Sequence, residues 1–208
     1  MHRHNLKNIA LFIPNLNGGG AQRAAINLAE GLLSLGCEVD LVVVKTGGPL
    51  TDDVYDRVNL INLNCSRTLF SVPKLTRHLN LNNYDALMAF MNYANITVAL
   101  ASLLSVSQHV LCLSEQNMLS QNLSDQNTLD RLLRYKLTHF AYKRADHVTA
   151  TSEGVATDLK KATGISHVDV VPNPITLGKG KVLRGKREKP HHAFLTGDPV
   201  ILGAGSLT

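Results

Sequence analysis

Short apolar runs bounded by turn residues recur along the chain. They span residues 8–13, 38–44, 58–63, 85–90, 109–113, 147–151 and 168–171. The runs are rich in Val, Ile and Leu, and most are continuous rather than alternating apolar with polar. This pattern is typical of strands buried on both faces, as in a parallel sheet.

Helical patterns separate these runs, at residues 21–35, 75–79, 96–104, 129–144 and 153–163. In the first of them one predicted face holds Ala24, Leu28, Leu32 and Leu35. In the segment 129–144 the predicted inward face holds Leu132, Leu133, Leu137, Phe140 and Ala141. Gly36 and Gly164 follow two of these patterns, where a helix end favours a residue with positive φ.

Strands and helices alternate in this way from residue 1 to residue 174. Repeated strand–helix–strand units form right-handed crossovers, so we expect an α/β, Rossmann-like parallel sheet with helices on both faces. Residues 175–198 are expected to be a basic interdomain linker. Residues 199–208 are apolar and run into a glycine turn, so they should be the first strand of a second domain that is largely missing.

Composition is that of an ordinary globular protein, with 44% hydrophobic and 18% charged residues among 208. The net charge of +5 is concentrated near the C-terminus. Lys179, Lys181, Arg184, Lys186, Arg187 and Lys189 crowd one segment. That segment is either a solvated linker or a surface for anions or a membrane. No aromatic residue lies between these charges, so we expect no nucleic-acid partner.

A triple glycine follows the first predicted strand and opens the first predicted helix. Gly18, Gly19, Gly20 and Ala21 stand where a backbone can approach a ligand without a Cβ in the way. Unpaired N–H groups at a helix N-terminus attract anions, and a phosphate above all. A tight turn that needs glycine for its own geometry is the alternative. The pattern is neither a dinucleotide fingerprint nor a P-loop.

Four segments in this order resemble the retaining family-4 glycosyltransferases of the GT-B fold. They are Gly18-Gly-Gly-Ala-Gln-Arg23, residues 145–156, Val168-Asp-Val-Val-Pro-Asn-Pro-Ile175 and residues 201–208. The resemblance implies an N-terminal acceptor-binding domain, a hinge at Asn173 and Pro174, and a C-terminal domain that binds a nucleotide sugar. It also implies that residues 18–21 contact the donor diphosphate, and that neither a metal nor another cofactor takes part.

The resemblance has departures that affect the donor site. Family members carry an arginine where this chain has Ser206, followed by a lysine beyond the last residue here. We therefore expect this chain to be inactive alone. Residues 114–117, where many relatives have a histidine, hold none, so no catalytic base can be assigned. The implied function is transfer of a hexose to a surface polysaccharide or a lipid-linked precursor. The alternative is a non-catalytic Rossmann-like binding module or an inactive fragment.

Polar residues after the later strands are candidates for an acceptor cleft, because ligands of parallel α/β sheets sit beyond the carboxyl ends of the strands. These candidates are Asn92, Glu115, Asn117, Ser152 and Glu153. Asn92 either contacts an acceptor hydroxyl or caps a helix. Glu115 either orients a hydroxyl or is an exposed loop carboxylate. Ser152 caps a helix whose N–H groups also face the cleft.

The expected setting is the cytoplasm, with peripheral contact to the inner face of the cell membrane. The implied partners are a nucleotide sugar and a glycan or glycolipid acceptor. The histidines are scattered without carboxylate or cysteine partners at ligand spacing, so a metal site is not expected. An apolar strand at 200–202 without its sheet should make the chain self-associate.

Overall fold

The protein folds around one parallel sheet, seen in a computed structural model that describes residues 6–54, 56–122 and 128–174. The strands are β1 (Asn8–Ile13), β2 (Glu38–Val43), β3 (Asn59–Asn62), β4 (Ala86–Phe90), β5 (Val110–Glu115), β6 (His147–Ala150) and β7 (Asp169–Val170). The α-helices are α1 (Gly20–Ser34), α2 (Val72–Leu81), α3 (Asn92–Leu104), α4 (Leu119–Asn122), α5 (Thr128–Arg144) and α6 (Glu153–Thr163). Two 3₁₀ turns, η1 (Thr51–Asp53) and η2 (Leu69–Ser71), complete the described elements. The predicted fold class is confirmed.

The strand order is β3-β2-β1-β4-β5-β6-β7, and all the pairs are parallel. The chain moves outward from β1 to β3, then returns to place β4 on the other side of β1. The carboxyl ends of β1 and β4 therefore lie side by side where the winding reverses. Such a switch point opens a crevice between neighbouring loops, which is where open α/β sheets bind ligands.

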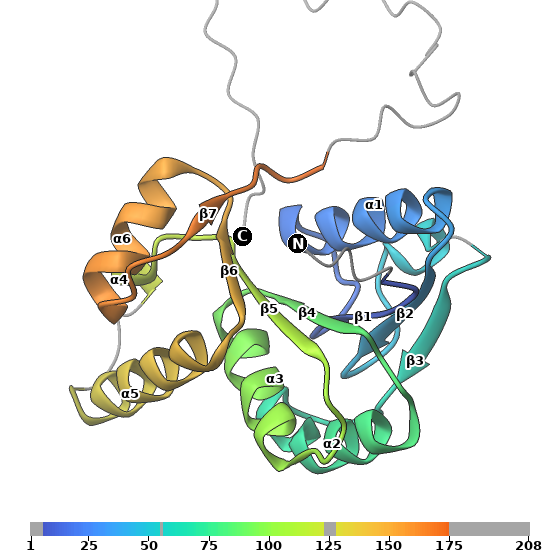
Figure 1. The fold of residues 1–208 in the computed structure, drawn as a ribbon, viewed down its shortest axis with the longest axis horizontal. Coiled ribbons are helices and arrows are strands. Elements are labelled where there is room, and N and C mark those ends of the chain that lie inside the picture. Colours follow the sequence, from blue (N-terminus) through green and yellow to red (C-terminus); the bar gives the residue numbers. More distant parts are fainter. Residues whose placement is uncertain (1–5, 55, 123–127, 175–208) are drawn as a thin grey trace, which may run out of the picture. The chain divides into compact units, whose positions relative to one another are not determined.

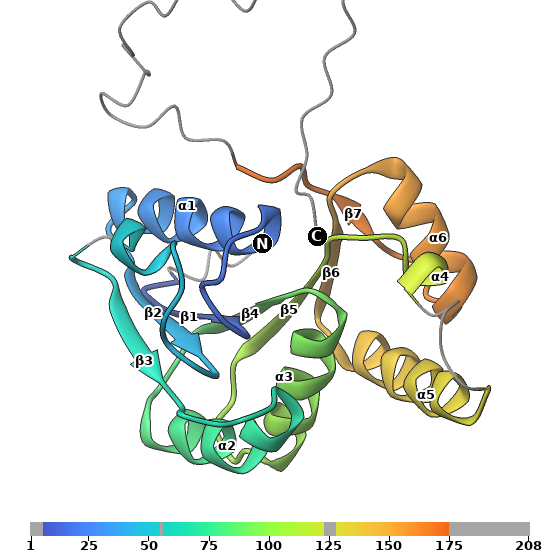
Figure 2. The ribbon, with the colours of Figure 1, turned by 180° about the vertical axis from the view of Figure 1, so that it is seen from behind.

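Helices cover both faces of the sheet, as Figure 1 and, from behind, Figure 2 show. Helix α1 packs one face through Ala25, Ile26 and Ala29, against strand residues such as Leu11 and Leu41. Helices α2, α3, α5 and α6 contribute to the apolar cluster on the other face. The continuous apolar strands follow from this arrangement, because each side of the pleat meets a helix or loop.

The buried face of α5 differs in part from the predicted one. Ala141 is buried and Leu137 packs against the apolar cluster, as predicted, but Leu132 is 53% exposed and Leu133 is 59% exposed. Thr138 and Tyr142 are buried instead, because their polar groups find buried hydrogen-bond partners. Leu35, placed on the inner face of the first helix, is 81% exposed just past the end of α1.

Two predicted loops belong to regular elements. Asn92 opens α3, and Glu115 closes β5 rather than following it. Gly164 has a φ of 68° at the end of α6, and its N–H donates to the Lys160 carbonyl, as the helix-end pattern predicted. The expected linker 175–198 and strand 199–208 lie outside the described residues.

Candidate functional site

The glycine turn between β1 and α1 lies at the switch point. Gly18 has a φ of 102° and Gly19 a φ of 154°, conformations that other residues rarely adopt. A Cβ on Gly19 would lie 2.6 Å from Gln22 Oε1, the end of a flexible side chain that can move aside, so the backbone angles impose the requirement. The turn itself therefore needs glycine at both positions. That geometry fits the tight-turn alternative, while the contact of residues 18–21 with a diphosphate stays a prediction.

Gly20 is different, because it is the first residue of α1 and has no positive φ. A Cβ there would meet no heavy atom within 4 Å. The fold thus leaves open space in front of Gly20. Gly19, the N-cap residue of α1, provides no side-chain hydrogen bond, so the first N–H groups of α1 remain available to a ligand.

A second uncapped helix begins on the other side of the switch point. Met91, between β4 and α3, has φ 79° and ψ 146° and makes no side-chain cap. Positive φ is costly for a residue with a long side chain, and such strain collects at functional sites. By contrast, Ser152 caps α6, since its Oγ accepts a hydrogen bond of 3.4 Å from the Val155 N–H. Its predicted capping role is confirmed.

Glu115, at the end of β5, is 1% exposed and sits in a buried polar network. Its Oε2 accepts a hydrogen bond of 2.6 Å from the Tyr142 hydroxyl. Its Oε1 accepts from the backbone N–H groups of Gln116 and Asn117, at 3.0 and 3.4 Å. The exposed-loop alternative for Glu115 is therefore wrong. Through these two hydrogen bonds, the carboxyl group fixes the backbone at the start of the loop that follows β5.

Asn95 extends this network to the neighbouring strand end. Its Nδ2 donates to the Ser114 carbonyl at 2.9 Å and to the Tyr142 hydroxyl at 2.7 Å. Because the Ser114 oxygen can only accept, the amide orientation is fixed, and the Tyr142 proton points to Glu115. Asn92, the other helix residue in the network, pairs with Thr138 Oγ1 at 3.2 Å. Asn92 is thus buried and tied to α5.

The network changes the acidity of its members. Burial raises the pKa of Glu115, and the hydrogen bonds that it accepts only partly oppose this. Burial, together with the adjacent Glu115 charge, raises the pKa of Tyr142 well above its ordinary value. The tyrosine therefore keeps its proton and acts as a permanent donor to the carboxyl group.

The predicted hinge residues contact two elements of the site. Asn173 Nδ2 donates to Gln116 Oε1 at 2.8 Å, and Gln116 Nε2 donates to Ser114 Oγ at 2.8 Å. Asn27 of α1 donates to the Pro174 carbonyl at 2.9 Å. The segment after β7 is therefore tied both to the end of β5 and to the helix that begins with the glycine turn.

Among the sequence candidates, Asn92 and Glu115 are brought together beneath the surface, whereas Asn117, Ser152 and Glu153 are exposed. Asn95, Thr138 and Tyr142 were missed. A signal for them existed: Asn95 interrupts an apolar helix, and Thr138 and Tyr142 are spaced i, i+4 on one face. Polar residues at those positions need buried partners.

The described residues hold neither a metal-type cluster nor a membrane-spanning helix. No group of three or more His, Cys, Asp and Glu side chains gathers there as metal ligands would. In the same part of the chain, no helix combines the length and apolar character needed to cross a bilayer.

The strand order, with its reversal between β1 and β4, defines an open, doubly wound α/β domain. The model of Glycosyltransferase Family 4 matches residues 18–179 of this chain. The chain belongs to glycosyltransferase family 4. No curated protein matches it significantly by sequence.

Solved structures confirm the GT-B relationship of the fold. Sucrose-phosphate synthase from Thermosynechococcus elongatus aligns over 80% of this chain with 16% identity and a TM-score of 0.64. HepE from Anabaena, solved with UDP and glucose, aligns over 81% with 18% identity and a TM-score of 0.60. WaaB, a lipopolysaccharide outer core galactosyltransferase, aligns over 81% with 14% identity and a TM-score of 0.57. The aligned parts cover 48%, 45% and 46% of those chains, so this chain spans about half their length.

Proposed function

We propose that this chain is the N-terminal, acceptor-binding half of a retaining glycosyltransferase. The enzyme moves a hexose from a nucleotide-diphosphate sugar to a surface polysaccharide or its lipid-linked precursor. Family membership supports the reaction class. The solved relatives with UDP and glucose, or described as a galactosyltransferase, support a nucleotide-sugar donor and a glycan-type acceptor.

One observation carries the proposal: the open backbone of Gly20 at the uncapped start of α1, at the switch point. A diphosphate that lies there meets N–H donors and the positive end of the helix dipole. As the glycosidic bond to the donor breaks, negative charge grows on the leaving diphosphate. Donors fixed in advance stabilise that charge without reorganising.

The acceptor lies beside the donor, in the crevice that the loops after β1 and β5 and the start of α3 form beyond the carboxyl ends of the strands. Here the buried carboxyl of Glu115 holds the backbone of Gln116 and Asn117 in place. The exposed side chain of Asn117 is then available to an acceptor hydroxyl. No metal or other cofactor is part of this mechanism. The proposed setting is the cytoplasm, at the inner face of the cell membrane.

A transfer assay tests this function on the protein encoded by the complete reading frame. Purified protein is incubated with UDP- and GDP-sugars and with glycan or lipid-linked acceptors, and products are identified by mass spectrometry. We expect one donor class to yield a product with the anomeric configuration of the donor. Acceptor binding without transfer from any donor would instead assign the chain as a binding module.

A further inference from the structure

Two hollows of different character meet at one arginine near the switch point. The first, of about 380 Å³, lies at the carboxyl ends of β1, β2 and β3, and its lining is mostly polar. Its polar lining includes Asn15, Asn17, Lys45, Thr46 and Ser66. The second, of about 790 Å³, lies along the outer side of α3, between η2 and α5. Both volumes fall in the range of small-molecule sites.

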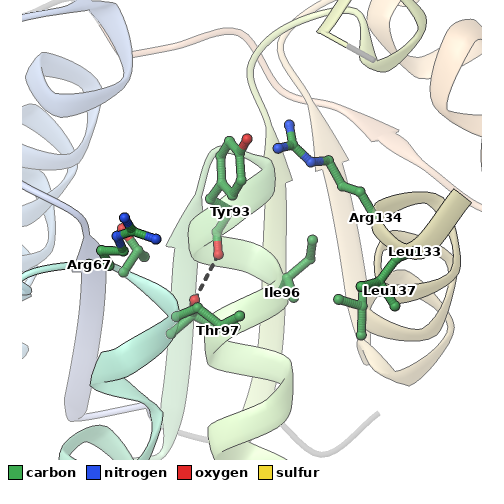
Figure 3. Close-up of a pocket in the computed structure, with 9 residues that line it drawn as sticks. Arg67, Tyr93, Ile96, Thr97, Leu133, Arg134 and Leu137 are labelled. Atoms are coloured by element: carbon green, nitrogen blue, oxygen red, sulfur yellow. Dashed lines mark hydrogen bonds between the residues drawn. The ribbon is translucent and has the colours of Figure 1, made fainter. Parts of the chain in front are cut away.

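The second hollow is an apolar groove with cations at its mouth. Figure 3 shows Ile96 of α3 and Leu133 and Leu137 of α5 lining it, with Arg67 on one side and Arg134 on the other. The exposed leucine of α5, which the sequence pattern wrongly placed inside, is thus part of the groove wall. An apolar hollow of this volume can hold the aliphatic part of a small molecule.

Arg67 and Thr68 line both hollows, so the two hollows adjoin at these side chains. The two lining sets, taken over the described residues, contain three cationic side chains, Lys45, Arg67 and Arg134, and no carboxylate. The Arg134 guanidinium lies 4.3 Å from the centre of the Tyr93 ring, which holds it beside the first turn of α3. Guanidinium groups bind phosphate through paired N–H donors.

We call the two adjoining hollows together the trough. The trough runs from the polar groups of the first hollow, past Arg67, to the aliphatic side chains of the second. A lipid-linked sugar has the same order: hydroxyl groups, then a phosphate, then an apolar chain. We propose that this trough binds an acceptor of that class, with the sugar head beside the glycine turn, the phosphate between Arg67 and Arg134, and the chain in the groove. This inference rests on the proposed function, and it selects the lipid-linked acceptor over a free glycan.

Calorimetry on the 208-residue chain tests the trough without requiring sugar transfer. The probes are alkyl phosphates kept below their critical micelle concentration, from butyl to dodecyl phosphate, with inorganic phosphate and an uncharged dodecyl glucoside for comparison. We expect dodecyl phosphate to bind more tightly than either comparison compound. Affinity should rise about twofold or more per added methylene group until the groove is filled.

Charge-removing variants locate the phosphate. Arg67→Gln and Arg134→Gln should each weaken dodecyl phosphate binding about tenfold, as expected for the loss of a charge-assisted hydrogen bond. Arg77→Gln, at an exposed position on α2, is the matched control and should stay within about twofold of wild type. The circular dichroism spectra of all three variants must match the wild-type spectrum. The series of alkyl chain lengths, measured on the wild type, provides a test that depends on no variant.

Several results would overturn the inference. Equal affinity for inorganic and dodecyl phosphate would describe a free-phosphate site, and equal affinity for the uncharged glucoside would remove the role of the arginines. Binding only to phosphatidylglycerol vesicles, weakened in Arg67→Gln and Arg134→Gln, would assign the cations to a membrane surface. Sugar transfer to a lipid-free glycan with no alkyl phosphate binding would refute the trough alone. Alkyl phosphate binding without any transfer would refute the proposed function alone.

Discussion

Replacing Tyr142 with phenylalanine removes one buried oxygen while keeping the ring and its packing. The lost hydroxyl donates to Glu115 at 2.6 Å and accepts from Asn95 at 2.7 Å. A hydrogen bond to a charged group contributes about 1.5–3 kcal/mol, and a neutral one about 1 kcal/mol. Asn95 keeps its bond to the Ser114 carbonyl, so its loss is partial. We expect Tyr142→Phe to lower the free energy of unfolding by about 2–4 kcal/mol.

The assay is urea unfolding followed by circular dichroism at 222 nm. Tyr135→Phe is the matched control, because Tyr135 is on the same helix and 40% exposed. It should change stability by no more than about 0.5 kcal/mol. A double-mutant cycle with Glu115→Gln should show a coupling energy of about 1 kcal/mol or more. If Tyr142→Phe unfolds within about 0.5 kcal/mol of wild type, the network does not hold the end of β5 as described.

Three further predictions concern the helix starts and the buried carboxyl group. Gly20→Ala should raise stability by up to about 1 kcal/mol and lower turnover in the complete enzyme. Gly31→Ala, at an equally open position in α1, should raise stability without lowering turnover. Thermal unfolding measures the stability, and initial rates measure the turnover. Because burial raises the pKa of Glu115, the folded state binds this proton more tightly than the unfolded state, where a glutamate has a pKa of about 4.3. The stability that this proton contributes is complete below about pH 4.3 and is lost as the pH rises through the pKa of Glu115 in the folded state. In urea titrations from pH 4 towards pH 7, wild type should therefore lose stability relative to Glu115→Gln. A difference in stability that stays constant with pH would contradict the raised pKa. Ser152→Ala should cost about 1 kcal/mol through the lost cap without altering alkyl phosphate binding by calorimetry, and a loss of binding would show that Ser152 contacts the ligand.

The order of strands and helices could be predicted from the sequence because it depends on local periodicity. Continuous apolar runs predicted buried parallel strands, and the later comparisons confirmed the family that the residue blocks resemble. Turn chemistry was equally local: Gly164 and Ser152 occupy helix ends through their own backbone and side-chain preferences. The glycine turn was located in the same way, since three successive glycines mark a backbone that needs unusual angles or close approach.

The composition of the site was decided by contacts between residues far apart in the chain. Tyr142 lies 27 positions from Glu115 and 47 positions from Asn95 in the sequence. A pattern read over one helix or strand therefore cannot include these partners. In the fold, Thr138 and Tyr142 of α5 face inward, where both find hydrogen-bond partners, and Leu133 lines the groove. The sequence alone assigned apolar residues to the interior because burial favours them. Tertiary structure changed that choice for Leu132 and Leu133, because a buried polar group is tolerated where a partner is already in place, and Leu133 lines the groove.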